Sequence, residues 1–163
     1  MAGARQEGPY VPDAIRAERG PVLRRTLRGL PDASLAALVR GLDRAGGDLA
    51  PGRLFRGGSG GCAVGVMLRE LEPETYAARG PRFWLVHSWR RRVRWYRGMA
   101  REHPRLQHLE WTFDRAAAAS SQRGLARREA AVAVGRWFRA EAEAELDWRR
   151  LALGSAGPRA VAA

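Results

Sequence analysis

The centre of the chain reads Phe55-Arg-Gly-Gly-Ser-Gly-Gly-Cys62-Ala-Val-Gly-Val-Met-Leu-Arg-Glu-Leu71. A glycine-rich loop here runs into a short amphipathic helix, and Pro73 prevents that helix from continuing. The apolar residues of this helix recur at helical spacing: Val64, Met67, Leu68 and Leu71. Gly65 lowers helix propensity by roughly 1 kcal/mol relative to alanine, so we interpret it as a point where a neighbouring element approaches closely. The pattern predicts a short, buried, central helix.

A second helical pattern precedes the glycine-rich loop. Its apolar residues follow Pro31 at spacings of three and four: Leu35, Leu38, Val39 and Leu42. Asp32 is placed to accept backbone N–H bonds as an N-cap, and Gly46-Gly47 supplies the left-handed stop that helix ends favour. We therefore expect a helix that begins at Asp32 and ends at Gly46.

Residues 82–101 fit two kinds of secondary structure. Phe83-Trp-Leu-Val86 alone has the composition of a buried strand. Over a longer window, however, six apolar residues share one face of a helix: Leu85, Val86, Trp89, Val93, Tyr96 and Ala100. We prefer the helix, because one rule then covers more residues. His103-Pro104 breaks this pattern and starts a further helix, whose buried stripe is Leu106, Leu109, Phe113 and Ala116 or Ala117.

The longest pattern runs from about Leu125 to Leu153. Alanine and tryptophan form a seam at spacings of three and four: Ala126, Ala130, Ala133, Trp137, Ala140, Ala144, Trp148 and Leu151. Small residues let a partner helix approach closely, so self-association into a homo-oligomer or scaffold through this seam is one functional hypothesis. Together, these patterns predict an all-α, single-domain bundle of about five helices over residues 21–153. We expect residues 1–20 to form a flexible arm and residues 154–163 a frayed tail.

The composition limits the class of protein. The formal net charge is +12, and all 29 basic residues are arginines. The positive electrostatic field of so many arginines favours anionic partners. The apolar runs are shorter than the roughly 18 residues of a membrane span, and the first ten residues lack the apolar core of a secretory signal. One cysteine cannot form an internal disulfide. We therefore expect a cytoplasmic protein that does not associate with membranes.

Much of the positive charge is concentrated in residues 82–105. This segment holds eight arginines and one acid, Glu102, a local charge of +7. In the helical arrangement four arginines form a narrow stripe beside the apolar face: Arg90, Arg94, Arg97 and Arg101. Trp84 and Trp95 flank Arg91 on another side. Arginines bind phosphates and tryptophan faces stack on unpaired bases. The leading hypothesis is therefore a non-enzymatic protein that engages nucleic acid or an acidic protein surface through these residues.

A second interpretation of the arginine stripe requires no partner. The aliphatic parts of the arginine side chains would cover apolar surface of the same chain, and their guanidinium groups would pair with acids of the last helix. Those acids are Glu141, Glu143, Glu145 and Asp147. The two interpretations differ in whether the last helix neutralises the stripe.

A cysteine-dependent enzyme is the remaining hypothesis. Cys62 begins a helix, where the helix dipole and free amides lower a thiol pKa. It would need a base such as His87, His103 or His108, and none lies at a diagnostic spacing. The simpler interpretation is a small buried hydrophobe. The glycine run lacks the Gly-Lys-Ser/Thr ending of a phosphate-binding loop, and His103, His108 and Glu110 do not form a di-iron pattern. We expect no cofactor and no metal.

Overall fold

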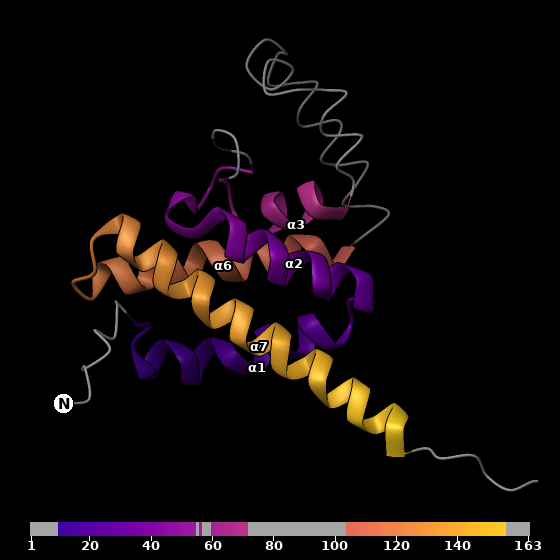
Figure 1. The fold of residues 1–163 in the computed structure, drawn as a ribbon. Coiled ribbons are helices and arrows are strands. Elements are labelled where there is room, and N and C mark those ends of the chain that lie inside the picture. Colours follow the sequence, from indigo (N-terminus) through magenta and orange to yellow (C-terminus); the bar gives the residue numbers. More distant parts are fainter. Residues whose placement is uncertain (1–9, 55, 57–59, 72–103, 156–163) are drawn as a thin grey trace, which may run out of the picture.

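Five α-helices and one short 3-10 helix make up the part of the chain described by the computed structural model, which is residues 10–54, 56, 60–71 and 104–155 (Figure 1). The elements are α1 (Asp13–Arg28), α2 (Asp32–Ala45), η1 (Gly46–Asp48), α3 (Ala63–Leu71), α6 (Pro104–Gln122) and α7 (Arg127–Ser155). The described residues hold no strand, only isolated bridges from Leu49 to Gly61 and from Arg56 to Gly60. The predicted all-α bundle is confirmed. The helix predicted over residues 82–101 lies outside the described residues.

The N-terminal end differs from the prediction. Helix α1 begins at Asp13 and contains Pro21, so the prediction of a flexible arm is wrong for residues 13–20. Proline removes one helical hydrogen bond, and this local penalty is offset because α1 buries one apolar face. That face consists of Ile15, Leu23 and Leu27, all fully or almost fully buried. At the other end, α7 extends to Ser155, so the predicted tail is wrong for residues 154 and 155.

Helix α2 has the predicted span, but its first turn is built differently. Pro31 occupies the N-cap position and no side chain caps the helix, so the expected role of Asp32 is wrong. The Asp32 carboxylate instead accepts a hydrogen bond from Arg149 of α7. Gly46 has a φ of +49°, as expected for a glycine that ends a helix.

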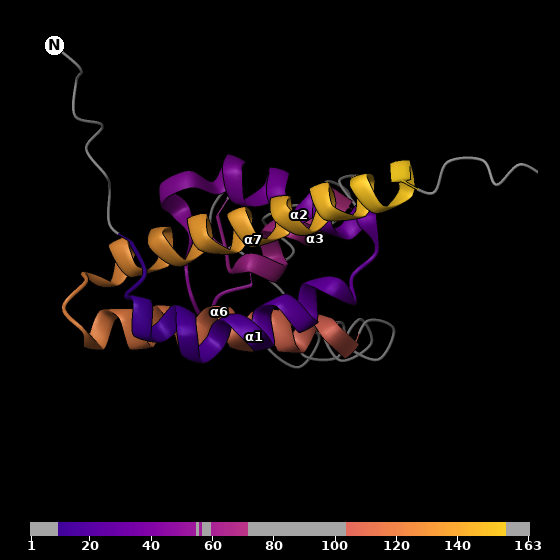
Figure 2. The same cartoon turned by 90° about the horizontal axis from the view of Figure 1, so that it is seen from below.

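The helices form two layers. Figure 2 shows α1 and α6 in one layer and α2 and α7 in the other. Helix α6 and helix α7 form an antiparallel hairpin, and Gly124, with a φ of +102°, lies in the turn between them. Helix α7 crosses the whole bundle, and its C-terminal end projects past the other helices in both views (Figures 1 and 2).

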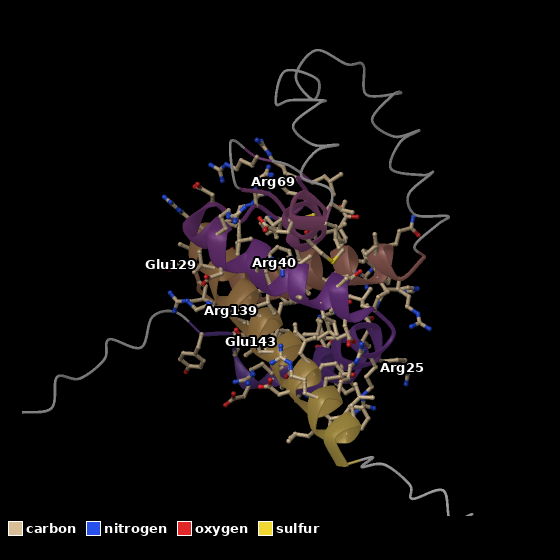
Figure 3. The ribbon with its side chains drawn as sticks, turned by 45° about the vertical axis from the view of Figure 1, so that its right-hand side comes forward. Arg25, Arg40, Arg69, Glu129, Arg139 and Glu143 are labelled. Atoms are coloured by element: carbon tan, nitrogen blue, oxygen red, sulfur yellow. The ribbon has the colours of Figure 1, made fainter. Side chains whose placement is uncertain are left out.

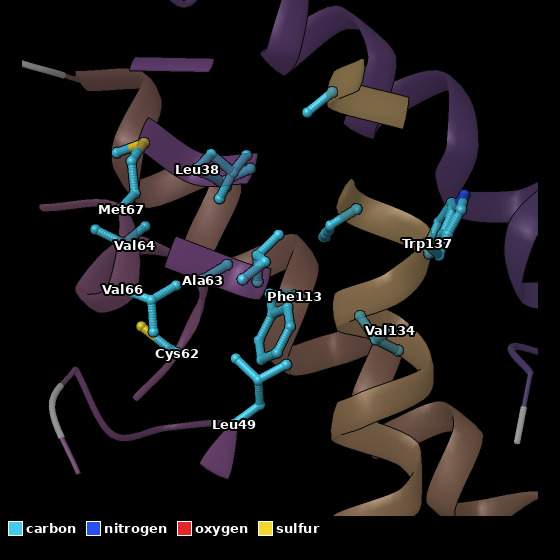
Figure 4. Close-up of a cluster of buried hydrophobic side chains, with 14 of the residues drawn as sticks. Leu38, Leu49, Cys62, Ala63, Val64, Val66, Met67, Phe113, Val134 and Trp137 are labelled. Atoms are coloured by element: carbon cyan, nitrogen blue, oxygen red, sulfur yellow. The ribbon is translucent and has the colours of Figure 1, made fainter. Parts of the chain in front are cut away.

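Aromatic and aliphatic side chains from the layers fill one core (Figure 4). Phe138 of α7 packs on Phe113 of α6 and on Trp137, with ring centroids 5.4 and 5.5 Å apart. The predicted stripe of α6 is buried: Leu106, Leu109, Phe113, Ala116 and Ala117. The two halves of the sequence therefore share a single hydrophobic core.

Helix α3 lies in this core between two backbone contacts. A Cβ at Gly41 of α2 would lie 2.5 Å from the Val66 carbonyl oxygen of α3. A Cβ at Gly65 would overlap the Leu54 carbonyl oxygen on another side of the helix. The predicted close approach at Gly65 is thus confirmed, and Leu54 supplies the neighbour.

Candidate functional site

Cys62 lies immediately before α3 and inside the core. Its side chain has no solvent exposure, and Figure 4 shows it among aliphatic residues of α3 such as Val66. Its backbone N–H donates to the Arg53 carbonyl oxygen over 2.7 Å. Its thiol lies 3.9 Å from the Glu110 Oε1 atom of α6. Cys62 therefore lies in the interior of the bundle, between the backbone at Arg53 and helix α6.

The surroundings of Cys62 keep its thiol protonated. Burial raises the pKa of Cys62, and the nearby Glu110 carboxylate raises it further. The N–H groups of Gly65 and Val64 at the start of α3 lower this pKa, as expected at a helix N-terminus, but the effect of burial is larger. A nucleophilic cysteine needs the opposite balance. Of the three histidines considered as a base for Cys62, His87 and His103 lie outside the described residues.

A cavity of about 470 Å³ lies on the same side of α6 as Glu110. Its described lining residues are Gln107, His108, Glu110, Trp111 and Asp114. Asp114 accepts a hydrogen bond from the Gly52 N–H over 2.9 Å, while burial raises the pKa of Asp114. Arg115 stacks on Trp111, 3.6 Å from the ring centroid. Within the described ranges no group of three His, Cys, Asp or Glu side chains could hold a metal ion.

None of the seven predicted anion-binding residues belongs to the described part of the chain. Trp84, Arg90, Arg91, Arg94, Trp95, Arg97 and Arg101 all lie outside the described residues. Arg105, the last arginine of that segment, is exposed in the first turn of α6. Its guanidinium lies over Gly29, the residue that follows α1. This contact places the last arginine of the segment beside the end of α1.

The four acids of α7 that could neutralise the arginine stripe already have arginine partners. Two of them pair with the arginines of α1, since Glu141 lies 3.3 Å from Arg24 and Glu145 lies 3.8 Å from Arg28. Within α7 the pairs are Glu145 with Arg149, Glu143 with Arg139, and Asp147 with Arg150. Figure 3 shows Arg139 and Glu143 beside each other on α7. These contacts reduce the negative charge that α7 offers to any other segment.

Several exposed arginines make no ion pair with an acid of the described ranges. Among them are Arg16, Arg25, Arg53, Arg56, Arg105, Arg123, Arg127 and Arg136. Arginines therefore outnumber the acids available to pair with them on the bundle itself, as well as in the 82–105 segment.

The alanine and tryptophan seam of α7 is covered along only part of its length. Ala126, the first residue of the predicted seam, is exposed and precedes α7. The next three residues of the seam, Ala130, Ala133 and Trp137, are buried as predicted. Farther along the same face, Trp148 is 64% exposed and Leu151 is 73% exposed. Between α1 and this exposed part lies a cavity of about 200 Å³, lined by Arg24, Leu27, Arg28, Glu141, Ala144, Glu145 and Trp148. The sequence carried no signal for the change, because the spacing is the same in both parts.

Two further findings bear on the class of protein. None of the described helices combines the length and the apolar character that crossing a membrane requires. No protein-family model, curated protein or solved structure matches this chain.

Proposed function

We propose that the chain is a non-enzymatic helical protein that binds nucleic acid through residues 82–105. The observation that carries this proposal is the local charge of +7 in that segment, combined with the pairing of the α7 acids by other arginines. Because the α7 acids are paired with other arginines, fewer acids compete with phosphate oxygens for the arginines of this segment. The buried, protonated thiol of Cys62 supports a binding role over cysteine-dependent catalysis.

Nucleic acid suits this segment better than an acidic protein surface. Trp84 and Trp95 are interleaved with the arginines in the sequence. Aromatic rings stack on unpaired bases, and each stacked base contributes roughly 1–3 kcal/mol. A chain of carboxylates offers charge but no such stacking partner. We therefore propose single-stranded RNA or DNA as the ligand, and an acidic protein surface becomes the competing outcome of the test.

Fluorescence anisotropy with a labelled, mixed-sequence single strand tests this proposal. We expect micromolar or tighter binding at low salt. The logarithm of the affinity should fall linearly with the logarithm of the salt concentration, with a slope of about −0.7 per phosphate neutralised. A poly-glutamate chain of similar length should bind more weakly, because it cannot stack. Equal affinity for poly-glutamate would favour the acidic protein surface, and no binding at low salt would refute both partners.

Two variants of equal net charge distinguish binding by residues 82–105 from attraction by the positive charge of the whole protein. One replaces Arg90, Arg94, Arg97 and Arg101 by glutamine; the control replaces Arg16, Arg25, Arg123 and Arg136 by glutamine. The control arginines are exposed and have no acidic partner in the described ranges. We expect the first variant to lose at least about tenfold in affinity and the control to lose only a few-fold. Equal losses would contradict the assignment to residues 82–105.

A further inference from the structure

One face of α7 is buried in its N-terminal half and exposed in its C-terminal half. Ala130, Ala133 and Trp137 share a face with Ala140, Ala144, Trp148 and Leu151, since all are spaced by threes and fours. The first three are buried, and the last four are exposed. The exposed four, which we name the α7 stripe, therefore continue a face that the bundle already uses for packing.

Two residues of the α7 stripe line the cavity between α1 and α7. Ala144 and Trp148 of α7 lie there together with Leu27 of α1. Helix α7 projects past its neighbours at this end (Figures 1 and 2). A contiguous apolar face rimmed by charged residues is typical of a protein interaction site, and a partially exposed tryptophan is the kind of residue that anchors one.

The order of side-chain sizes along the stripe indicates its partner. Two small residues, Ala140 and Ala144, are followed by two large ones, Trp148 and Leu151. If a second α7 lies antiparallel with its centre near residue 146, Trp148 of each copy meets Ala144 of the other. Leu151 then meets the region of Ala140. A parallel arrangement would instead place Trp148 against Trp148 and leave the alanines without a large neighbour.

Charges beside the stripe favour the same arrangement. Glu143 and Arg150 are seven residues apart, so they lie two turns apart on one side of the helix. In the antiparallel arrangement, Glu143 of each copy lies opposite Arg150 of the other. Within one copy these residues already take part in ion pairs, Glu143 with Arg139 and Arg150 with Asp147, which are exposed and can be shared or exchanged.

We infer that the chain forms a twofold-symmetric dimer in which the α7 stripes of two copies pack antiparallel. The interface is isologous, because each copy contributes both the large and the small residues. Four stripe residues per copy cover less than the roughly 800 Å² per partner of a standard interface, so we expect dissociation in the micromolar range. This inference does not depend on nucleic-acid binding.

Sedimentation equilibrium over a range of protein concentrations tests the dimer. The full chain should show a reversible monomer–dimer equilibrium. Trp148→Ala should weaken it at least about tenfold, the effect of losing an anchor residue, with an unchanged monomer fold by circular dichroism. Trp111→Ala is the matched control, since Trp111 is 57% exposed on α6 and lies outside the stripe. A strict monomer, or equal effects of both substitutions, would overturn the inference.

A mixing experiment tests the antiparallel arrangement itself. Glu143→Arg alone places two arginines opposite each other at both symmetric positions, and Arg150→Glu alone places two glutamates there. Each variant should therefore dimerise several-fold more weakly than the parent chain. An equimolar mixture should recover the association. In the mixed dimer the introduced arginine of one variant meets the introduced glutamate of the other, and the native pair of Glu143 and Arg150 forms at the second position. Failure of the mixture to associate more strongly than either variant would refute this geometry.

Discussion

Arg149 of α7 donates a hydrogen bond to the Asp32 carboxylate at the start of α2, over 2.5 Å. The same guanidinium donates to carbonyl oxygens at and after the end of α1, those of Leu27, Arg28 and Leu30. One side chain thus joins three helices where α1 turns into α2. Its own position is held by Glu145, one turn earlier in α7.

We expect Arg149→Met to destabilise the protein by about 2 kcal/mol, because hydrogen bonds to charged groups contribute about 1.5–3 kcal/mol each and part of the loss is compensated by water. Arg150→Met is the matched control. Arg150 is adjacent in sequence, and its side chain is 74% exposed, with only Asp147 as a partner in the described ranges, so its loss should change stability by less than about 0.5 kcal/mol. Urea unfolding of both variants measures the difference, and similar midpoints would contradict the bridging role of Arg149.

Two glycine-to-alanine substitutions in helices should differ greatly in their cost. Gly65→Ala places a Cβ on top of the Leu54 carbonyl oxygen, which is backbone and cannot rotate away. We expect a loss of several kcal/mol, in the range of severe overpacking. Gly20→Ala in α1 makes an ordinary contact with the Arg24 guanidinium at 3.4 Å. Because Pro21 follows and its ring crowds the Cβ of a preceding helical residue, the helix-propensity gain of about 0.5–1 kcal/mol is offset, and the net change should be within about 1 kcal/mol. Thermal unfolding of both variants checks the prediction, and a neutral Gly65→Ala would contradict the packing of α3.

Cys62 should make the protein less stable at alkaline pH. The folded-state pKa of Cys62 is raised by burial, so the folded chain holds its proton while the unfolded chain releases it above about pH 8.5. The contribution of the protonated Cys62 thiol to the free energy of unfolding is therefore fully present below that pH. It declines as the pH rises, by at most about 1.4 kcal/mol per pH unit. Comparing urea midpoints at neutral and alkaline pH should show a smaller decline for Cys62→Ala than for the parent chain. Equal declines would show that another group is responsible.

Asp114 should lower stability at neutral pH through its charge. Burial raises the pKa of Asp114 in the folded state, so this group favours folding most below its unfolded pKa of about 3.9, and that contribution is lost as the pH rises through the folded pKa. Asp114→Asn keeps an oxygen for the Gly52 N–H and should equal or exceed the parent stability at neutral pH. Asp114→Ala loses that hydrogen bond and should be about 1 kcal/mol less stable than Asp114→Asn. Thermal unfolding at neutral and acidic pH separates these effects, and an Asn variant that is the less stable of the two would contradict them.

Helical periodicity predicted most of the described helices correctly. Helices α2, α3, α6 and α7 have the expected centres, since each buries one face and therefore repeats apolar residues every three or four positions. Helix α1 was predicted poorly because Gly20-Pro21 interrupts its pattern in the middle. Burial of Ile15 on one side of the interruption and of Leu23 on the other overrides that local signal.

Of the candidate sites, the sequence could identify residue types but not their surroundings. Cys62 at a helix start fits both a reactive thiol and a core residue. The choice depends first on burial in the core and then on Glu110, which is 48 residues away. Likewise, one of the two interpretations paired the acids of α7 with the arginine stripe, and the structure shows that two of these acids pair with arginines of α1. Such contacts depend on packing between distant segments, which periodicity does not encode.

The sequence by itself determined that this protein is a helical bundle with an arginine-rich segment, because face periodicity and charge are properties of neighbouring residues. Only the tertiary structure decided which residues on the same face of a helix are buried and which are exposed to solvent. Trp137 and Trp148 occupy the same face of α7, yet one is 5% and the other 64% exposed. The reason is coverage: neighbouring side chains pack over Trp137 but not over Trp148, although the adjacent Arg149 is still bonded to α1 and α2. The same pattern therefore forms core at one end and exposed surface at the other.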